Sequence, residues 1–149
     1  MQKILLTLLV ACAGTSASTP ASAGLFSAKG PVIAILAGEL FVGEAEGHLG
    51  GAGTLVIRSQ KDPALVCVGE FTSSEELGGS GKLRCSDSAT ASFSFQRLSV
   101  FRGHGGGTTS RGPMSFAYGF SPVEAVPYLK PPAGKKLAHN GTELVLVGL

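Results

Sequence analysis

The chain has 149 residues, of which 44% are hydrophobic and 15% are charged, and its formal net charge is +2. A charge so close to neutrality produces no broad positive field for binding nucleic acid, so we expect no nucleic-acid partner. The length beyond the N-terminal region is enough for one domain with a single core.

The N-terminal segment has the pattern of a targeting signal. Lys3 precedes an apolar run from Ile4 to Ala11 that is too short to span the hydrocarbon layer of a membrane. The residues Leu9-Val10-Ala11-Cys12 resemble the lipobox of bacterial lipoproteins. This resemblance implies cleavage before Cys12 and a diacylglyceryl group on the Cys12 sulfur.

The lipobox resemblance implies an address in the bacterial cell envelope, because several acyl chains hold a protein on a bilayer where one would not. Ala13, rather than Asp, follows the cysteine, which favours the outer membrane with the domain facing the periplasm. Residues 1–11 would be the signal peptide, and residues 12–30, rich in Ser, Thr, Ala and Pro, a flexible tether. An alternative stays open: Ala21-Ser22-Ala23 is an Ala-x-Ala site, and cleavage after Ala23 would yield a periplasmic or secreted protein.

Residues 31–149 carry the pattern of a single all-β domain. Gly accounts for 22 residues of the chain, and helical periodicity never extends beyond about two turns. Short apolar runs with strand-like alternation recur instead. These runs are Leu40–Val42, Leu55–Ile57, Ala91–Phe95, Met114–Tyr118 and Leu144–Val147.

Two local signals lie toward the C-terminus. Ser121-Pro122-Val123-Glu124 is a capping box with Pro in the first turn, and Pro127 limits the length of the helix that this box begins. We therefore expect at most one short helical turn, near residues 121–129. The dipeptide Asn140-Gly141 predicts a type I′ hairpin turn, whose central positions both need positive φ.

An internal repeat predicts how the strands pair. Phe41-Val42-Gly43-Glu44 recurs as Cys67-Val68-Gly69-Glu70, and the segment 49–57 recurs as 77–85. Each copy has the pattern of one hairpin with a Gly-rich connection. Because isolated hairpins cannot bury a face, we expect a small antiparallel meander of repeated hairpins that closes into a barrel or a two-sheet sandwich.

The repeat also predicts a disulfide. Superposing the copies places Cys67 on Phe41 and Cys85 on Ile57, so each pair is expected to lie directly opposite across its hairpin. That arrangement suits a cystine, whose Cα atoms lie about 4.4 to 6.8 Å apart. A cystine implies a compartment outside the cytoplasm. A redox role is disfavoured, because catalytic dithiols usually lie two residues apart.

The segment from Arg102 to Arg111 is the candidate binding loop. Arg102, His104 and Arg111 stand in a run of glycines that leaves backbone donors accessible to a polar ligand or an envelope protein. A plain flexible connection is the alternative. A binding module would also expose an aromatic patch, for which the candidates are Phe101, Phe120 and Tyr128.

Catalytic and metal-binding patterns are weak. His104-Gly105-Gly106-Gly107 imitates the oxyanion loop of lipases, but no Gly-x-Ser-x-Gly elbow accompanies it. The residues His48, His104 and His139 are distant in sequence, so only the fold could assemble them with a carboxylate into a zinc site. We expect a structural or binding module without catalytic residues, metal or cofactor. A small metal-dependent enzyme using His104 is the alternative.

Overall fold

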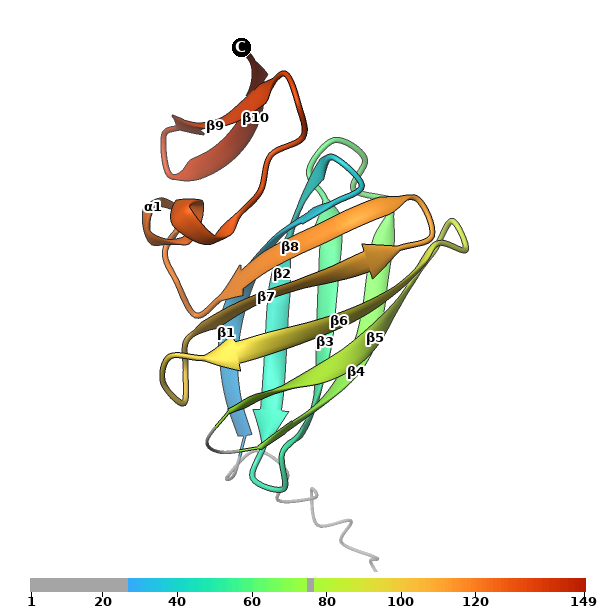
Figure 1. Ribbon diagram of the computed structural model, residues 1–149, viewed down its shortest axis with the longest axis vertical. Coiled ribbons are helices and arrows are strands. Elements are labelled where there is room, and N and C mark those ends of the chain that lie inside the picture. Colours follow the sequence, from blue (N-terminus) through green and yellow to red (C-terminus); the bar gives the residue numbers. More distant parts are fainter. Residues whose placement is uncertain (1–26, 75–76) are drawn as a thin grey trace, which may run out of the picture.

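The structure is a computed structural model that describes residues 27–74 and 77–149 (Figure 1). Eight strands form a closed barrel, and a short helical segment and a two-stranded sheet come after it in the chain. Each barrel strand pairs antiparallel with its sequence neighbours, and β8 closes the ring by pairing with β1. The expected all-β meander is confirmed, and it closes as a barrel rather than as a sandwich.

The barrel strands are β1 (Ser27–Leu36), β2 (Glu39–His48), β3 (Ala52–Ser59), β4 (Val66–Ser74), β5 (Gly78–Cys85), β6 (Thr90–Arg97), β7 (Gly103–Thr109) and β8 (Gly112–Tyr118). The C-terminal elements are α1 (Pro122–Ala125), the 3-10 turn η2 (Val126–Tyr128), β9 (Lys135–Asn140) and β10 (Glu143–Gly148). The five expected apolar runs lie in β2, β3, β6, β8 and β10.

The N-terminal predictions fall mostly outside the described residues. β1 begins at Ser27, so residues 27–30, which the sequence assigned to the tether, belong to the barrel. The signal peptide, Cys12 and the remainder of the tether lie outside the described residues. Within the part that the structure describes, no helix is long and apolar enough to cross a bilayer.

Alternation along each strand places one set of side chains inside the barrel. In β3 and β6 burial changes residue by residue, as the sequence pattern predicts. Inward glycines make room for aromatic rings on neighbouring strands. A Cβ added at Gly81 would lie 2.5 Å from the Phe93 ring, and one added at Gly105 would lie 2.8 Å from the Phe116 ring. The high glycine content therefore serves the packing of rings inside the barrel.

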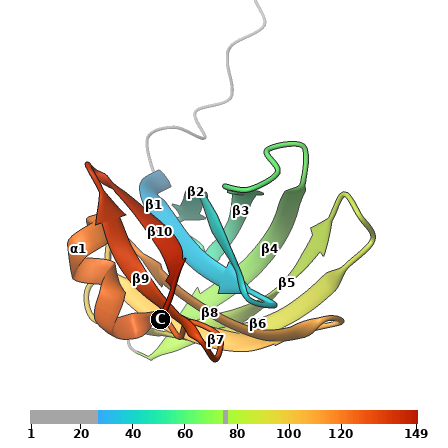
Figure 2. The same ribbon diagram turned by 90° about the horizontal axis from the view of Figure 1, so that it is seen from above.

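The second half of β1, residues 32–36, is buried on both faces, because the C-terminal elements cover its outer side (Figure 2). Ala34 faces the interior, whereas Ile33 and Ile35 pack outward in a second core. The other members of that core come from β2, β8, α1, β10 and the adjoining connections, and they are Leu40, Ala117, Phe120, Ala125, Leu129 and Leu144.

The expected helical turn at Ser121 is confirmed. The Ser121 Oγ accepts a hydrogen bond from the Glu124 backbone N–H at 3.4 Å, and the Ser121 N–H donates to the Glu124 carboxylate at 3.0 Å. These two bonds form the capping box. The β9–β10 hairpin is also present, but the predicted turn is wrong by one position. Asn140 pairs with Glu143, so Gly141 and Thr142 are the central residues, and of these only Gly141 has positive φ (66°).

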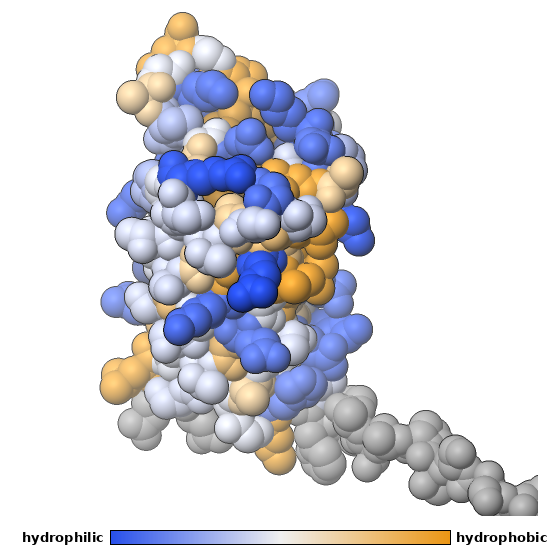
Figure 3. All heavy atoms as spheres, turned by 90° about the vertical axis from the view of Figure 1, so that its right-hand side faces the viewer, coloured by the Kyte–Doolittle hydropathy of each residue, from blue (hydrophilic) through white to orange (hydrophobic). Residues whose placement is uncertain are grey.

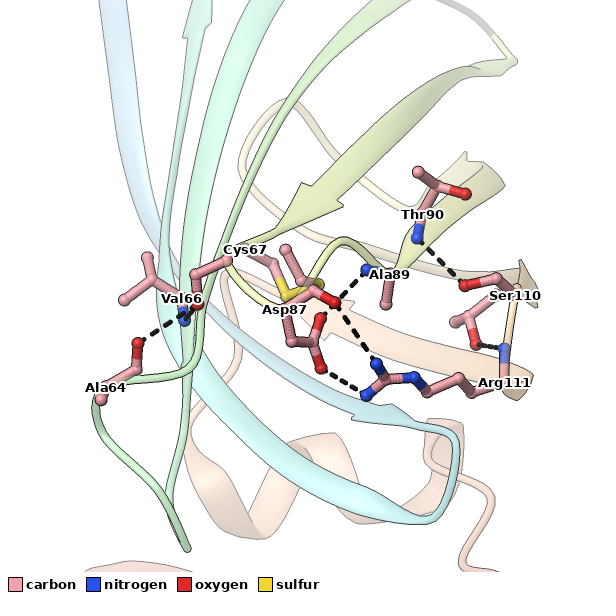
Figure 4. Close-up of a disulfide and its surroundings, with 11 residues drawn as sticks. Ala64, Val66, Cys67, Asp87, Ala89, Thr90, Ser110 and Arg111 are labelled. Atoms are coloured by element: carbon pink, nitrogen blue, oxygen red, sulfur yellow. Dashed lines mark hydrogen bonds and ion pairs between the residues drawn. A yellow bond between two sulfur atoms is a disulfide. The ribbon is translucent and has the colours of Figure 1, made fainter.

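The disulfide joins the expected residues. Cys67 on β4 and Cys85 on β5 are directly paired and bonded (Figure 4). Their Cα atoms are 3.9 Å apart, closer than the expected lower bound of about 4.4 Å.

The equivalent pairing in the first hairpin is wrong by two residues. Phe41 lies opposite Ser59, and Ile57 lies opposite Gly43. Since side chains alternate with a period of two, this shift keeps Phe41 and Ile57 on the inner face, where both are buried. The repeat therefore predicted the faces of the strands correctly and the register of this hairpin incorrectly.

Candidate functional site

The barrel interior contains a cavity of about 1020 Å³. Its lining includes the start of β1 and residues of the β2–β3 and β6–β7 connections, so the cavity opens at this end of the barrel, which we call the mouth. The mouth lies at the lower end of the molecule in Figure 1. Ligand pockets in proteins commonly measure roughly 300–1,000 Å³. The inner wall is largely apolar and aromatic, with Val32, Leu55, Ile57, Phe71, Phe93, Phe95, Met114 and Phe116.

The opposite end of the barrel is closed by buried side chains. Phe41, Cys67 and Cys85 belong to the interior core there, and Cys67 has 0% of its surface exposed. Arg111 and Asp87 form an ion pair on the surface beside the disulfide (Figure 4). A smaller hollow of about 190 Å³ adjoins this end. The large cavity is therefore a pocket with one entrance rather than a channel.

Arg97 brings a positive charge into the cavity wall. It ends β6 and comes after Phe93 and Phe95 on the same inward face, and it lines the cavity with them. Its Nη2 donates a hydrogen bond to the Ser73 Oγ at 2.9 Å, whereas its Nε is buried without a hydrogen-bond partner. Among the described residues that line the cavity, none is Asp or Glu. Arg97 is thus a cation without a matching carboxylate among the described residues of this wall.

Tyr118 stands beside Arg97 across a single glycine. Gly103 on β7 pairs with Arg97 on one side and with Tyr118 on the other, so the two larger side chains flank a position without a side chain. A Cβ added at Gly103 would lie 2.5 Å from the Tyr118 ring. The ring also packs edge-on against Phe95, with centroids 5.8 Å apart.

The Tyr118 hydroxyl is a second unused hydrogen-bonding group at this place. It is buried and has no hydrogen-bond partner. Burial away from water raises the pKa of the Tyr118 phenol above its ordinary value, and the nearby Arg97 guanidinium offsets part of that rise. Tyr118 therefore remains a neutral donor at physiological pH, next to a permanent cation.

Large apolar side chains surround the mouth. They project from the β2–β3, β4–β5 and β6–β7 connections, and each is more than half exposed. We call these residues the rim: Leu49, Leu77, Leu98, Val100 and Phe101. Figure 3 shows apolar side chains protruding at the lower end of the molecule, and a further apolar area higher on the same face. Apolar side chains gathered in this way typically mark an interaction surface.

The segment predicted as a binding loop is instead a strand. β7 occupies Gly103–Thr109 and pairs with both β6 and β8. The physical reason is that its inward glycines lie against aromatic side chains of these two neighbours, so a sequence that looks flexible is held by packing. Arg102 and Arg111 lie at opposite ends of this strand and do not form one site.

Each of the three candidate residues of that segment contacts the rest of the fold. The Arg102 Nη1 lies 3.7 Å from the Glu124 Oε1, and Arg111 pairs with Asp87. His104 stacks on Tyr128 with ring centroids 4.4 Å apart. These contacts give all three side chains a role in packing and in surface ion pairs.

The two carboxylates in these ion pairs have lowered pKa values. The pKa of Asp87 falls mainly because a backbone N–H of Ala89 donates to it, and Arg111 contributes further. The pKa of Glu124 falls mainly because the Ser121 backbone N–H and side chain hydrogen-bond to it, with Arg102 adding a smaller effect. Both groups are at the surface and outside the cavity.

The remaining candidates are dispersed. His48 lies at the mouth, His104 on β7 and His139 on β9. Within residues 27–74 and 77–149, no three His, Cys, Asp or Glu side chains are placed to hold a metal ion. Of the three candidate aromatic residues only Phe101 is strongly exposed, since Phe120 is buried and stacks on Tyr128.

Neither Arg97 nor Tyr118 was predicted from the sequence as a site residue. The alternation of β6 from Ala91 through Phe93 and Phe95 continues to Arg97, so this pattern, extended by one step, would have placed the guanidinium inside the barrel. No family model matches the chain, and comparison with curated proteins and with solved structures likewise finds no match.

Proposed function

We propose that this protein is an envelope-anchored binding module whose barrel holds an elongated apolar molecule. The observation that carries the proposal is the cavity of about 1020 Å³, with one entrance and an apolar, aromatic wall. Eight-stranded barrels either fill their interior with side chains or retain space for one small ligand. Here the inward glycines let the rings lie against the wall, which leaves that space open.

The N-terminal end of β1, which follows the proposed lipid anchor in the chain, belongs to the mouth of the barrel. β1 begins at Ser27, in the lining of the mouth, so a diacylglyceryl group on Cys12 would hold this end toward the bilayer. The apolar rim supports the same orientation, because exposed Leu and Phe side chains gain stability in the interfacial layer of a membrane. A membrane-derived ligand would then enter the barrel without crossing bulk water.

The test of the anchor is fractionation of cells that express the protein. With Cys12→Ser, we expect the protein to leave the membrane fraction or to remain unprocessed, and mass spectrometry of the unchanged protein should find lipid on Cys12. The Cys67–Cys85 disulfide supports an oxidising compartment whether the chain is cleaved before Cys12 or after Ala23. A mature chain that begins at Gly24 would establish the alternative of a periplasmic or secreted protein and remove the anchor.

The test of the cavity is uptake of the neutral dye N-phenyl-1-naphthylamine, whose fluorescence rises in apolar surroundings. We expect Leu55→Trp to reduce the affinity at least tenfold, because Leu55 lines the cavity and an indole there would occupy it. The neighbouring Val56→Trp is the matched control, since Val56 points outward. Circular dichroism should show that both variants fold. Absence of uptake by the unchanged protein, or equal uptake by the two variants, would refute the proposal.

A further inference from the structure

We infer that the cavity selects molecules with one hydrocarbon chain and an anionic head group, and that Arg97 and Tyr118 hold this head group at the mouth. The inference rests on the proposed binding function and adds the chemical class of the ligand. A fatty acid and an acidic lysophospholipid share this chemistry.

The charge of the cavity wall is unbalanced among the described residues. The described lining contains the basic residues Lys29, His48 and Arg97 but no carboxylate. The Lys29 ammonium lies 3.6 Å from the Glu44 carboxylate and 3.8 Å from that of Glu46, so its charge already has partners. Arg97 has only neutral neighbours among the described residues, namely the Ser73 hydroxyl, to which it donates, and the Tyr118 hydroxyl. A partly buried guanidinium is stabilised when an anion supplies the missing charge, so the cavity favours an anionic ligand.

Two polar groups near the mouth have unsatisfied hydrogen-bonding capacity. The Nε of Arg97 and the hydroxyl of Tyr118 are both buried and lack hydrogen-bond partners. Both groups can donate hydrogen bonds, and the Tyr118 hydroxyl lies over Gly103, where an added Cβ would come within 2.3 Å of it. An anionic oxygen of a carboxylate or phosphate that reaches this place would accept from the Arg97 Nε and from the Tyr118 hydroxyl. An apolar ligand alone would leave both donors unsatisfied, which costs free energy.

The inner face of β6 changes from charged at the mouth to apolar in the interior. Arg97 stands at the mouth, and Phe95, Phe93 and Ala91 lie beyond it on the same face of β6, toward the closed end. At about 3.3 Å per residue, Phe93 lies about 13 Å from Arg97 along β6. The charged group is therefore confined to the entrance and the apolar wall to the interior. An amphipathic molecule with its charge at one end fits this distribution.

The experiment measures displacement of N-phenyl-1-naphthylamine from the processed protein after bound lipid has been removed on a hydrophobic resin. The competitors are palmitate, palmitoyl lysophosphatidic acid and hexadecanol, which differ in the head group. We expect the unchanged protein to bind the two anions at least tenfold more tightly than hexadecanol. Preference between the two anions then distinguishes a free fatty acid from a membrane lipid as the source.

The variants separate a head-group site from a structural role. Arg97→Gln should weaken binding of both anions about tenfold to a hundredfold, since it removes a charge-assisted hydrogen bond, and leave hexadecanol binding unchanged. Arg97→Lys should restore part of the preference, and Tyr118→Phe should weaken the anions several-fold. Arg84→Gln, on the outer face of β5, is the control and should change nothing. Thermal unfolding of each variant verifies that it is folded.

The outcomes are distinguishable from failure of the proposed function. Equal affinity for palmitate and hexadecanol, or loss of both in folded Arg97→Gln, would overturn the head-group site while the apolar cavity remains a binding site. If none of the three competitors displaces the dye, and the dye itself does not bind, both proposals fail. Weakened anion binding in Arg84→Gln would show that the effect comes from overall charge, and it too would overturn the assignment to Arg97.

Discussion

Removal of the disulfide should destabilise the barrel by an amount that its loop length sets. Cys67 and Cys85 are 18 residues apart in sequence, and the chain-entropy model gives about 3 kcal/mol of stabilisation for closing a loop of this length. A domain of this size loses about 4 °C in Tm per kcal/mol. The double variant Cys67→Ala/Cys85→Ala should therefore melt about 12 °C lower than the oxidised protein, with the same barrel at low temperature.

The assay is denaturant unfolding followed by circular dichroism, with and without dithiothreitol. Reduction should lower the stability of the unchanged protein to that of the double variant and leave the double variant unaffected. The matched control is Val68→Ala/Arg84→Ala, the neighbouring cross-strand pair, which points outward and has no covalent link. A double cysteine variant within about 0.5 kcal/mol of the oxidised protein would refute the entropic argument. An effect of dithiothreitol on the stability of the double cysteine variant would also refute the entropic argument.

Two further predictions concern the ion pair beside the disulfide and a glycine of the barrel wall. Arg111→Ala should raise the pKa of Asp87 only part of the way to the ordinary 3.8, because the largest cause of the lowering, a hydrogen bond from a backbone N–H, remains; an unchanged pKa in a carboxyl NMR titration would refute this contribution. A lowered pKa means that the folded state stabilises the ionised carboxylate. The folding stability that Asp87 contributes is therefore present above the ordinary pKa and is lost as the pH falls through the lowered value. Asp87→Asn should therefore make unfolding less sensitive to acid. Gly105→Ala should cost about 1 to 3 kcal/mol in denaturant unfolding, because the added Cβ would lie 2.8 Å from the Phe116 ring and against the backbone of β6. Gly50→Ala, where nothing lies within 4 Å, is the control, and equal stability of the two variants would contradict the packing role of the inward glycines.

The sequence by itself determined the features that depend on short-range patterns. Alternation of apolar residues identified five of the strands, and the capping box at Ser121 identified the helical turn. The repeated hairpin identified Cys67 and Cys85 as partners, because one hairpin contains both residues and its register is short-range. Such features are encoded within a few residues or a single hairpin, so they are readable without knowledge of the remaining fold.

Tertiary structure decided the register of the first hairpin and the folding of the glycine-rich segment Gly103–Thr109 as a strand. A shift of two residues leaves every side chain on its face, so alternation could not distinguish Phe41 opposite Ile57 from the observed Phe41 opposite Ser59. The run from Gly103 to Gly107 has almost no strand preference of its own. It becomes β7 because β6 and β8 supply hydrogen bonds on both sides and aromatic rings against its inward face.

The cavity was likewise decided only by closure of the barrel. Alternation shows that Arg97 and Tyr118 share the inner face of their own strands, but it does not show that these strands flank Gly103 or that both residues stand at the same end. The pairing of β8 with β1 closes the ring around the aromatic rings and leaves the interior open at the mouth. Whether a barrel retains such a space depends on the summed volumes of inward side chains from all eight strands, and no local pattern contains that sum.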